Sequence, residues 1–202
     1  MSPSRPYPGE APYDLIEHRH RLAVWAAARA ASRGGEWGVT VERAFDWIAH
    51  LGLRNLLIGY DNLIAPDQFD EQHRSWRHKV IDRAGMNDAG ASLSHGKAAK
   101  LINAYVKVGV VCASCEADGQ IPIAGRARIG AIHPPIDRIL LRRLPRREGT
   151  DDAAFFAAIR PWSQFNSNEY ERVIERLRAI ALSCRPNEPL EFWQLEQFWA
   201  GH

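Results

Sequence analysis

The sequence predicts an all-α protein, a compact globular bundle of about eight helices. Two observations favour this class. Apolar residues recur at three- and four-residue steps along most of the chain, and no stretch alternates apolar and polar residues for long enough to form a sheet, beyond one short strand near residues 121–123. The 202 residues, 46% of them hydrophobic, are enough for a single core. We therefore expect one helical domain over residues 15–202, preceded by a flexible proline-rich leader over residues 1–14.

Four helices are expected in the first half of the chain. Leu22, Trp25 and Ala26 form the apolar stripe of the first helix, which a pair of glycines ends. Thr40 is a suitable N-cap for the second helix, and Pro66 can open the fourth. The expected ranges are residues 15–33, 41–51, 53–60 and 66–85.

The second half should contain the longest buried helix, over residues 93–111, after a glycine-containing turn. Glycines and prolines then interrupt the periodicity over residues 112–132, so we expect an irregular connection there. Pro134-Pro135 can start another helix because proline suits the first helical turn. The remaining expected helices cover residues 136–144, 151–159, 167–182 and 187–199.

Basic and acidic residues nearly balance, with 26 against 24 and a net charge of +2. The chain is therefore not a polycation, and any surface that binds nucleic acid must be a local patch. Clustered arginines between residues 126 and 143 could form such a patch, and an ordinary solvated face explains them equally well. The arginines concerned are Arg126, Arg128, Arg138, Arg142 and Arg143.

No run of apolar residues is long enough to cross a membrane. The first twenty residues contain four prolines and lack the apolar segment of a signal peptide. We expect a cytoplasmic monomer that has no contact with membranes.

The three cysteines, an odd number without an export signal, are expected to be reduced thiols rather than disulfides. Cys112 and Cys115 have the spacing of a metal-binding pair, but a structural zinc site needs four ligands and only His133 and Cys184 could complete it. Three cysteines also cannot hold a four-cysteine iron–sulfur cluster. The sequence therefore predicts no metal and no cofactor.

Lysines share one face of the expected helix over residues 93–111. Lys97, Lys100 and Lys107 fall on this face together with Ala104, while an apolar face points elsewhere. The lysine face looks either into solvent, the usual reason for such spacing, or into a cleft. A lysine that is partly desolvated in a cleft has a lowered pKa and can act as an amine nucleophile.

Two neighbouring features could serve the same chemistry. The turn Ser94-His95-Gly96 enters the lysine helix, and the unpaired N–H groups at such a helix start suit a phosphate. Asp137 lies near the start of the next helix, where the helix dipole favours its ionised form. A carboxylate there could stabilise a positively charged sugar and activate an amine or a water. It could also be only a helix cap.

Three parts of this region resemble the helix-hairpin-helix superfamily of DNA glycosylases: Ser94-His95-Gly96, Lys100-Leu101-Ile102-Asn103-Ala104-Tyr105-Val106-Lys107 and His133-Pro134-Pro135-Ile136-Asp137. The likeness is closest to the archaeal 8-oxoguanine DNA glycosylases, in which a catalytic lysine begins a Lys-x6-Lys helix and a Pro-x-x-Asp turn supplies an aspartate. It covers residues 92–141. The hairpin departs from the usual Leu-Pro-Gly-x-Gly turn, since this chain has Leu93-Ser94-His95-Gly96.

The resemblance implies a helix-hairpin-helix element within the bundle and an enzyme that flips a damaged or modified base out of double-stranded DNA and excises it. Lys100 would form the Schiff base of a bifunctional glycosylase and AP-lyase, Asp137 would be the catalytic aspartate, and Lys97 competes with Lys100 for the nucleophile's position. The DNA contacts would come from the residues around them: Ser94, His95, Gly96, Lys97, Lys107, His133 and Arg138. Trp162 and Phe165 lie in a proline-flanked loop without clear helical burial, so they could contact the flipped base or could be core residues. Oxidised guanine and hypermodified pyrimidines are equally compatible targets.

Two alternatives stay open. The chain could be a non-catalytic helix-hairpin-helix subunit that binds DNA, for instance in phage defence. It could also be a helical protein-interaction domain that uses exposed Trp193 and Trp199 as anchors.

Overall fold

The computed structural model describes residues 13–32, 38–87, 93–116, 118–185 and 189–200. These residues form helices and turns and contain no strand, so the predicted all-α class is confirmed. Residues 1–12 of the expected leader lie outside the described part of the chain, and Asp14 at its end caps the first helix. No helix within the described ranges is long and apolar enough to span a membrane.

Helices α1 to α4 follow the expected order through the first half of the chain. Their bounds, with those of the short helical turns between them, are α1 Leu15–Ala31, α2 Val41–His50, η1 Leu53–Leu57, η2 Tyr60–Asn62, α3 Phe69–Asn87, α4 His95–Val106 and the π-helical turn η3 Lys107–Val111. Thr40 caps α2 as expected, because its hydroxyl accepts a hydrogen bond from the amide of Arg43.

The second half consists of shorter helices around one longer one. Their bounds are α5 Ile123–Gly130, α6 Arg138–Arg143, α7 Asp152–Ala158, η4 Trp162–Gln164, α8 Ser167–Cys184 and the 3₁₀ helix η5 Phe192–Phe198. The last segment begins later than the expected residue 187 and winds more tightly than an α-helix.

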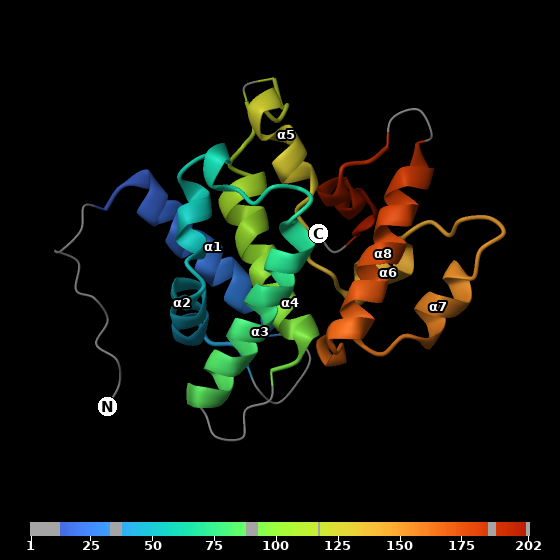
Figure 1. Cartoon of the computed structure of the whole chain (residues 1–202), viewed down its shortest axis with the longest axis horizontal. Helices are drawn as coiled ribbons and strands as arrows, with labels where there is room; N and C mark the ends of the chain where they lie inside the picture. Colours follow the sequence, from blue (N-terminus) through green and yellow to red (C-terminus); the bar gives the residue numbers. More distant parts are fainter. Residues whose placement is uncertain (1–12, 33–37, 88–92, 117, 186–188, 201–202) are drawn as a thin grey trace.

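Helix α4 runs between two hydrophobic cores (Figure 1). The first core lies among α1, α2, α3 and α4, and the second lies among α6, α8 and η5, where α4 contributes Ala99. Every residue from Gly96 to Val106 is buried, so α4 has no solvated face. The lysine face of this helix therefore looks toward the second half of the molecule.

The expected stripe of α1 is wrong. Leu22 and Trp25 are each 51% exposed, and the buried side of the helix consists largely of small residues such as Ala23 and Ala27. Because alanine side chains are short, α1 can lie close against α4, where His20 Nδ1 is 2.8 Å from the hydroxyl of Tyr105. Residue size decided this packing, and the larger apolar residues were left outside.

The expected irregular connection contains helix α5, and the expected strand at residues 121–123 is absent from the described chain. Glycine misled the prediction here. A Cβ at Gly125 would lie 2.5 Å from the ring of Tyr60, so this glycine permits close packing within a helix and does not mark a loop.

Candidate active site

Lys100 and Asp137 meet at the junction of the two cores. The ammonium Nζ of Lys100 lies 3.1 Å from Oδ2 of Asp137 and donates a second hydrogen bond to the carbonyl of Pro135, also at 3.1 Å. The Lys100 side chain is 9% exposed and that of Asp137 is 19% exposed. A buried helix thus presents its amine to a carboxylate from the turn that precedes α6.

Burial lowers the pKa of Lys100 from its ordinary value, since a charged ammonium loses its water there. The carboxylate of Asp137 opposes this shift and does not cancel it. A lowered pKa increases the fraction of neutral amine near pH 7, and the neutral amine is the nucleophilic form.

Asp137 is both a helix cap and a member of this site. Its Oδ1 accepts the amide of Leu140 at 2.9 Å, which caps α6. Its Oδ2 accepts hydrogen bonds from Lys100 and from the indole Nε1 of Trp199, the latter at 2.9 Å. The two interpretations of this aspartate are therefore compatible, because each uses a different oxygen.

Helix η5 and Trp199 pack against the lysine side of α4 and η3. Glu196 of η5 forms an ion pair with Lys107, and Lys107 Nζ lies 5.9 Å from the ring centroid of Trp199. Burial raises the pKa of Glu196. Glu196 was not among the residues predicted from the sequence. Its spacing of three residues from Trp199 was the only signal available, and that spacing also occurs on any helical turn.

The two tryptophans proposed as exposed anchors are both partly buried and hydrogen-bonded. Trp193 Nε1 donates to Glu191 at 2.6 Å, and Trp199 Nε1 donates to Asp137. This geometry removes the observation on which the protein-interaction alternative depended.

The expected base-contacting aromatic residues have different environments. Trp162 is partly buried, and its ring centroid lies 5.7 Å from Lys100 Nζ, so it borders the site. Phe165 is 1% exposed and belongs to the second core. The expectation that Phe165 contacts a base is therefore wrong, whereas Trp162 stays a candidate.

The expected phosphate site at Ser94, His95 and Gly96 is covered by the segment 162–165. The hydroxyl of Ser94 donates to the carbonyl of Ser163 at 2.6 Å, and the amide of Gly96 donates to the carbonyl of Phe165 at 3.2 Å. A Cβ at Gly96 would lie 1.7 Å from the carbonyl oxygen of Trp162. The glycine serves this close approach of two backbones, and the expected phosphate site is covered in this structure.

His95 and Lys97 on the same turn are also withdrawn from the surface. His95 packs edge-on against His78, and burial, helped by the charge of Arg77, lowers its pKa to about 4. His95 is neutral at pH 7 and offers a phosphate no charge. Lys97 is 7% exposed, so a DNA contact would require its neighbours to move.

His133 lies in a buried hydrogen-bond network and does not reach the surface. It is 2% exposed, its Nδ1 lies 3.0 Å from the hydroxyl of Tyr170, and its Nε2 lies 2.8 Å from Asp70. Burial lowers its pKa, so the ring is neutral. The expected DNA contact of His133 is wrong, because its two ring nitrogens already have protein partners.

This network holds the turn that carries Asp137. Asn103 of α4 donates from its amide nitrogen to the carbonyl of Pro134 at 3.0 Å and to Tyr170 at 3.1 Å. Its carbonyl oxygen lies 2.8 Å from Nε2 of His73. Asn103 lies three residues after Lys100, so one helix positions both the amine and the turn. No sequence pattern predicts this role, since Asn103 resembles any other polar residue of a helix.

The five expected arginines separate into two groups. Arg126 lies 3.8 Å from Glu191, and Arg128 donates to the carbonyl of Leu63. The other three, Arg138, Arg142 and Arg143, are exposed on α6 and form no ion pair with any residue of known placement. The local basic patch is therefore the outer face of α6, which begins directly after Asp137.

The three cysteines are unpaired thiols. Among residues 13–32, 38–87, 93–116, 118–185 and 189–200, no group of three or more His, Cys, Asp or Glu side chains is placed to hold a metal ion. The comparisons with known proteins found no matching family model, no matching curated protein and no matching solved structure. The glycosylase resemblance accordingly remains a prediction from the residues themselves.

Proposed function

We propose that this protein is a DNA glycosylase with AP-lyase activity that uses Lys100 as its nucleophile. The observation that carries the proposal is the contact between a desolvated amine and a carboxylate, 3.1 Å apart and enclosed by aromatic side chains. A buried lysine with a lowered pKa beside a proton acceptor is the arrangement that imine-forming catalysis needs.

In the proposed reaction, neutral Lys100 Nζ attacks C1′ of an extruded nucleotide. The bond between C1′ and the base nitrogen breaks, and the base leaves with the electron pair and takes up a proton. The attacking nitrogen loses a proton to Asp137, and opening of the sugar ring gives the imine. Loss of a C2′ proton with the 3′ phosphate then cuts the strand. Asp137 would also stabilise positive charge on the sugar before the new bond forms.

DNA would lie along the outer face of α6. Its three exposed arginines follow Asp137 in the sequence and would bind phosphates next to the extruded nucleotide. Lys100 is 9% exposed, so an extruded nucleotide can reach it only if η5 or the segment around Trp162 moves aside. Damaged or modified bases are the substrate class because unpairing such a base costs less.

Borohydride trapping tests this proposal. Duplexes that carry oxidised, alkylated, deaminated or hypermodified bases are incubated with the protein and borohydride, which reduces the imine to a stable crosslink. We expect a crosslinked species on at least one duplex. Without borohydride, the same duplex should be nicked. Lys100→Gln should abolish the crosslink, while Lys79→Gln, on the exposed side of α3, should leave it unchanged.

The competing lysine is tested in the same assay. Trapping that persists in Lys100→Gln and is lost in Lys97→Gln would transfer the nucleophile to Lys97. No trapping on any duplex, together with equal affinity for undamaged DNA, would favour the second candidate function, a DNA-binding subunit without catalysis. The arginines of α6, which form no ion pair within the described part of the chain, support this second candidate, because they would bind phosphate without any need for the amine.

A further inference from the structure

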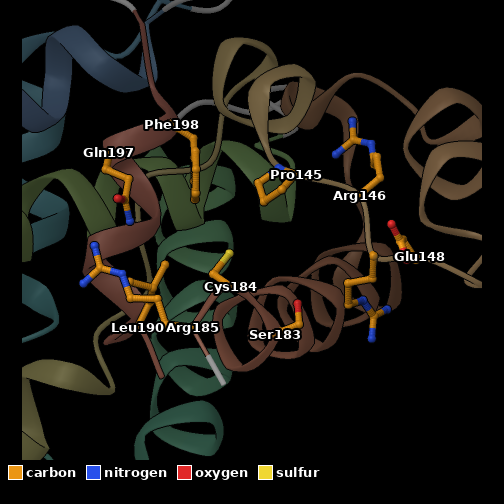
Figure 2. A pocket seen from close by; sticks show the side chains of 10 residues that line it. Pro145, Arg146, Glu148, Ser183, Cys184, Arg185, Leu190, Gln197 and Phe198 are labelled. Atoms are coloured by element: carbon orange, nitrogen blue, oxygen red, sulfur yellow. The ribbon is translucent and has the colours of Figure 1, made fainter. Parts of the chain in front are cut away.

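A hollow of about 660 Å³ opens on the side of the second core, between the end of α8, the segment after α6, and η5 (Figure 2). Its volume falls within the range of about 300–1,000 Å³ that small-molecule sites occupy. Pro145, Leu190 and Phe198 line it with apolar surface, and Cys184 adds a thiol. None of these residues has a role in the proposed base excision.

Two guanidinium groups stand at opposite ends of this apolar surface (Figure 2). Arg146 is fixed in place, because it donates to the carbonyls of Leu144 and Leu141 at 2.9 and 2.8 Å. Arg185 is exposed, and its side chain forms no ion pair or hydrogen bond with residues of known placement. A third arginine, Arg147, is neutralised by a bidentate contact with Asp152.

The charge of the hollow is therefore positive at the Arg185 end, whereas at the other end Glu148 lies beside Arg146 (Figure 2). Glu148 is the acidic residue of its lining, and it is exposed at the rim. A ligand that fits must carry negative charge for Arg185 and an apolar or aromatic portion for the surface between the two arginines. A nucleotide has both features, since its phosphate pairs with guanidinium and its base stacks on an aromatic ring.

The hollow also lies at the end of the basic face of α6. Leu144, the C-cap of this helix, follows Asp137 by seven positions, which corresponds to about 10 Å at about 1.5 Å per residue. Base-pair steps of B-DNA rise about 3.4 Å each, so this length spans about three steps. A strand that follows α6 away from Asp137 would reach the hollow within a few nucleotides.

We propose that this hollow binds a nucleotide, with its phosphate on the exposed guanidinium of Arg185 and its sugar or base against Phe198 and Leu190. The nucleotide has two conceivable sources, the continuing strand of DNA held on α6 or a free nucleotide. Binding from the strand rests on the DNA binding proposed above and does not require base excision.

Cys184 lines the hollow and serves as the reporter. In a Cys112→Ser/Cys115→Ser variant, both of whose changes are at exposed thiols, Cys184 is the single cysteine. Its alkylation by iodoacetamide is timed with no addition, with dAMP, with deoxyadenosine, and with a 16-nucleotide oligonucleotide. A probe that occupies about nine-tenths of the sites should slow the labelling about tenfold.

Protection by dAMP at millimolar concentration assigns the site to free nucleotides, and protection by the oligonucleotide alone assigns it to a bound strand. Protection by neither probe overturns the proposal. Equal protection by deoxyadenosine and dAMP overturns the phosphate contact. Arg185→Gln should remove protection, whereas Arg172→Gln, an exposed arginine elsewhere on α8, should not. Borohydride trapping is measured in the same variants, so failure of this site is distinguishable from failure of the glycosylase.

Discussion

Asp137→Asn tests the central contact of the site, because it removes the charge of this residue and keeps its shape. Asparagine is as good an N-cap as aspartate, so the cap of α6 survives. At 3.1 Å and an effective dielectric of about 20, the attraction between the two charges is about 5 kcal/mol. Taking two ions out of water costs several kcal/mol for each, so the net contribution of the intact pair to stability is close to zero.

Removal of one member of the Lys100–Asp137 pair lowers stability much more than removal of both. In Asp137→Asn the oxygen that caps α6 is kept and an NH2 group faces Lys100, so of the described acceptors the Pro135 carbonyl alone still accepts from the buried ammonium. We expect Asp137→Asn to lower the free energy of unfolding by about 3 kcal/mol. Lys100→Met should cost less, because Asp137 would keep its hydrogen bonds from Leu140 and Trp199. The double variant should recover at least about 1 kcal/mol relative to the sum of the single effects.

Urea unfolding of the four proteins at pH 7 measures this coupling. Single effects that add to within about 0.5 kcal/mol would show that the two residues do not interact, and would refute the site geometry. The pH dependence gives a second measure. The folded pKa of Lys100 is lowered from about 10.5, so the unfolded chain binds more protons between the two values and stability should rise with pH in that window. Lys100→Met should remove that rise, and an identical slope in both proteins would contradict the assignment.

Three further predictions concern the surroundings of the site. Gly85 lies in open space on α3, so Gly85→Ala should raise the free energy of unfolding by ~1 kcal/mol. Gly96→Ala should lower the free energy of unfolding by several times that amount, and urea unfolding measures both effects. Arg142→Glu/Arg143→Glu should weaken binding to any duplex and reduce the slope of log affinity against log salt by about two, and an unchanged slope would exclude α6 as the DNA surface. The pKa of His95 is about 4 in the folded protein and about 6.5 unfolded, so its contribution to stability is lost as the pH falls below about 6.5. His95→Gln should therefore flatten the loss of stability between pH 6.5 and pH 4, and an unchanged curve would show that His95 is not buried as described.

The sequence alone determined the helical class and the local ends of several helices. A period of three to four residues is a property of neighbouring positions, and a cap such as Thr40 contacts an amide only three residues away. The same local logic offered Asp137 as a cap of α6 and placed three lysines on one face of α4 and its continuation η3. These features need no knowledge of distant parts of the chain.

The tertiary structure decided which of these residues share a site. Glu196 and Trp199 reach Lys107 and Asp137 across 89 and 62 residues of sequence, and no local pattern marks such contacts. The tertiary structure also explains two glycines, because Gly96 allows the backbone of Trp162 to pack closely and Gly125 allows the ring of Tyr60 to do so. Periodicity reports that a face is apolar or charged. Burial, which changes the pKa of Lys100 and withdraws His133 from any ligand, depends on what packs against that face from elsewhere in the chain.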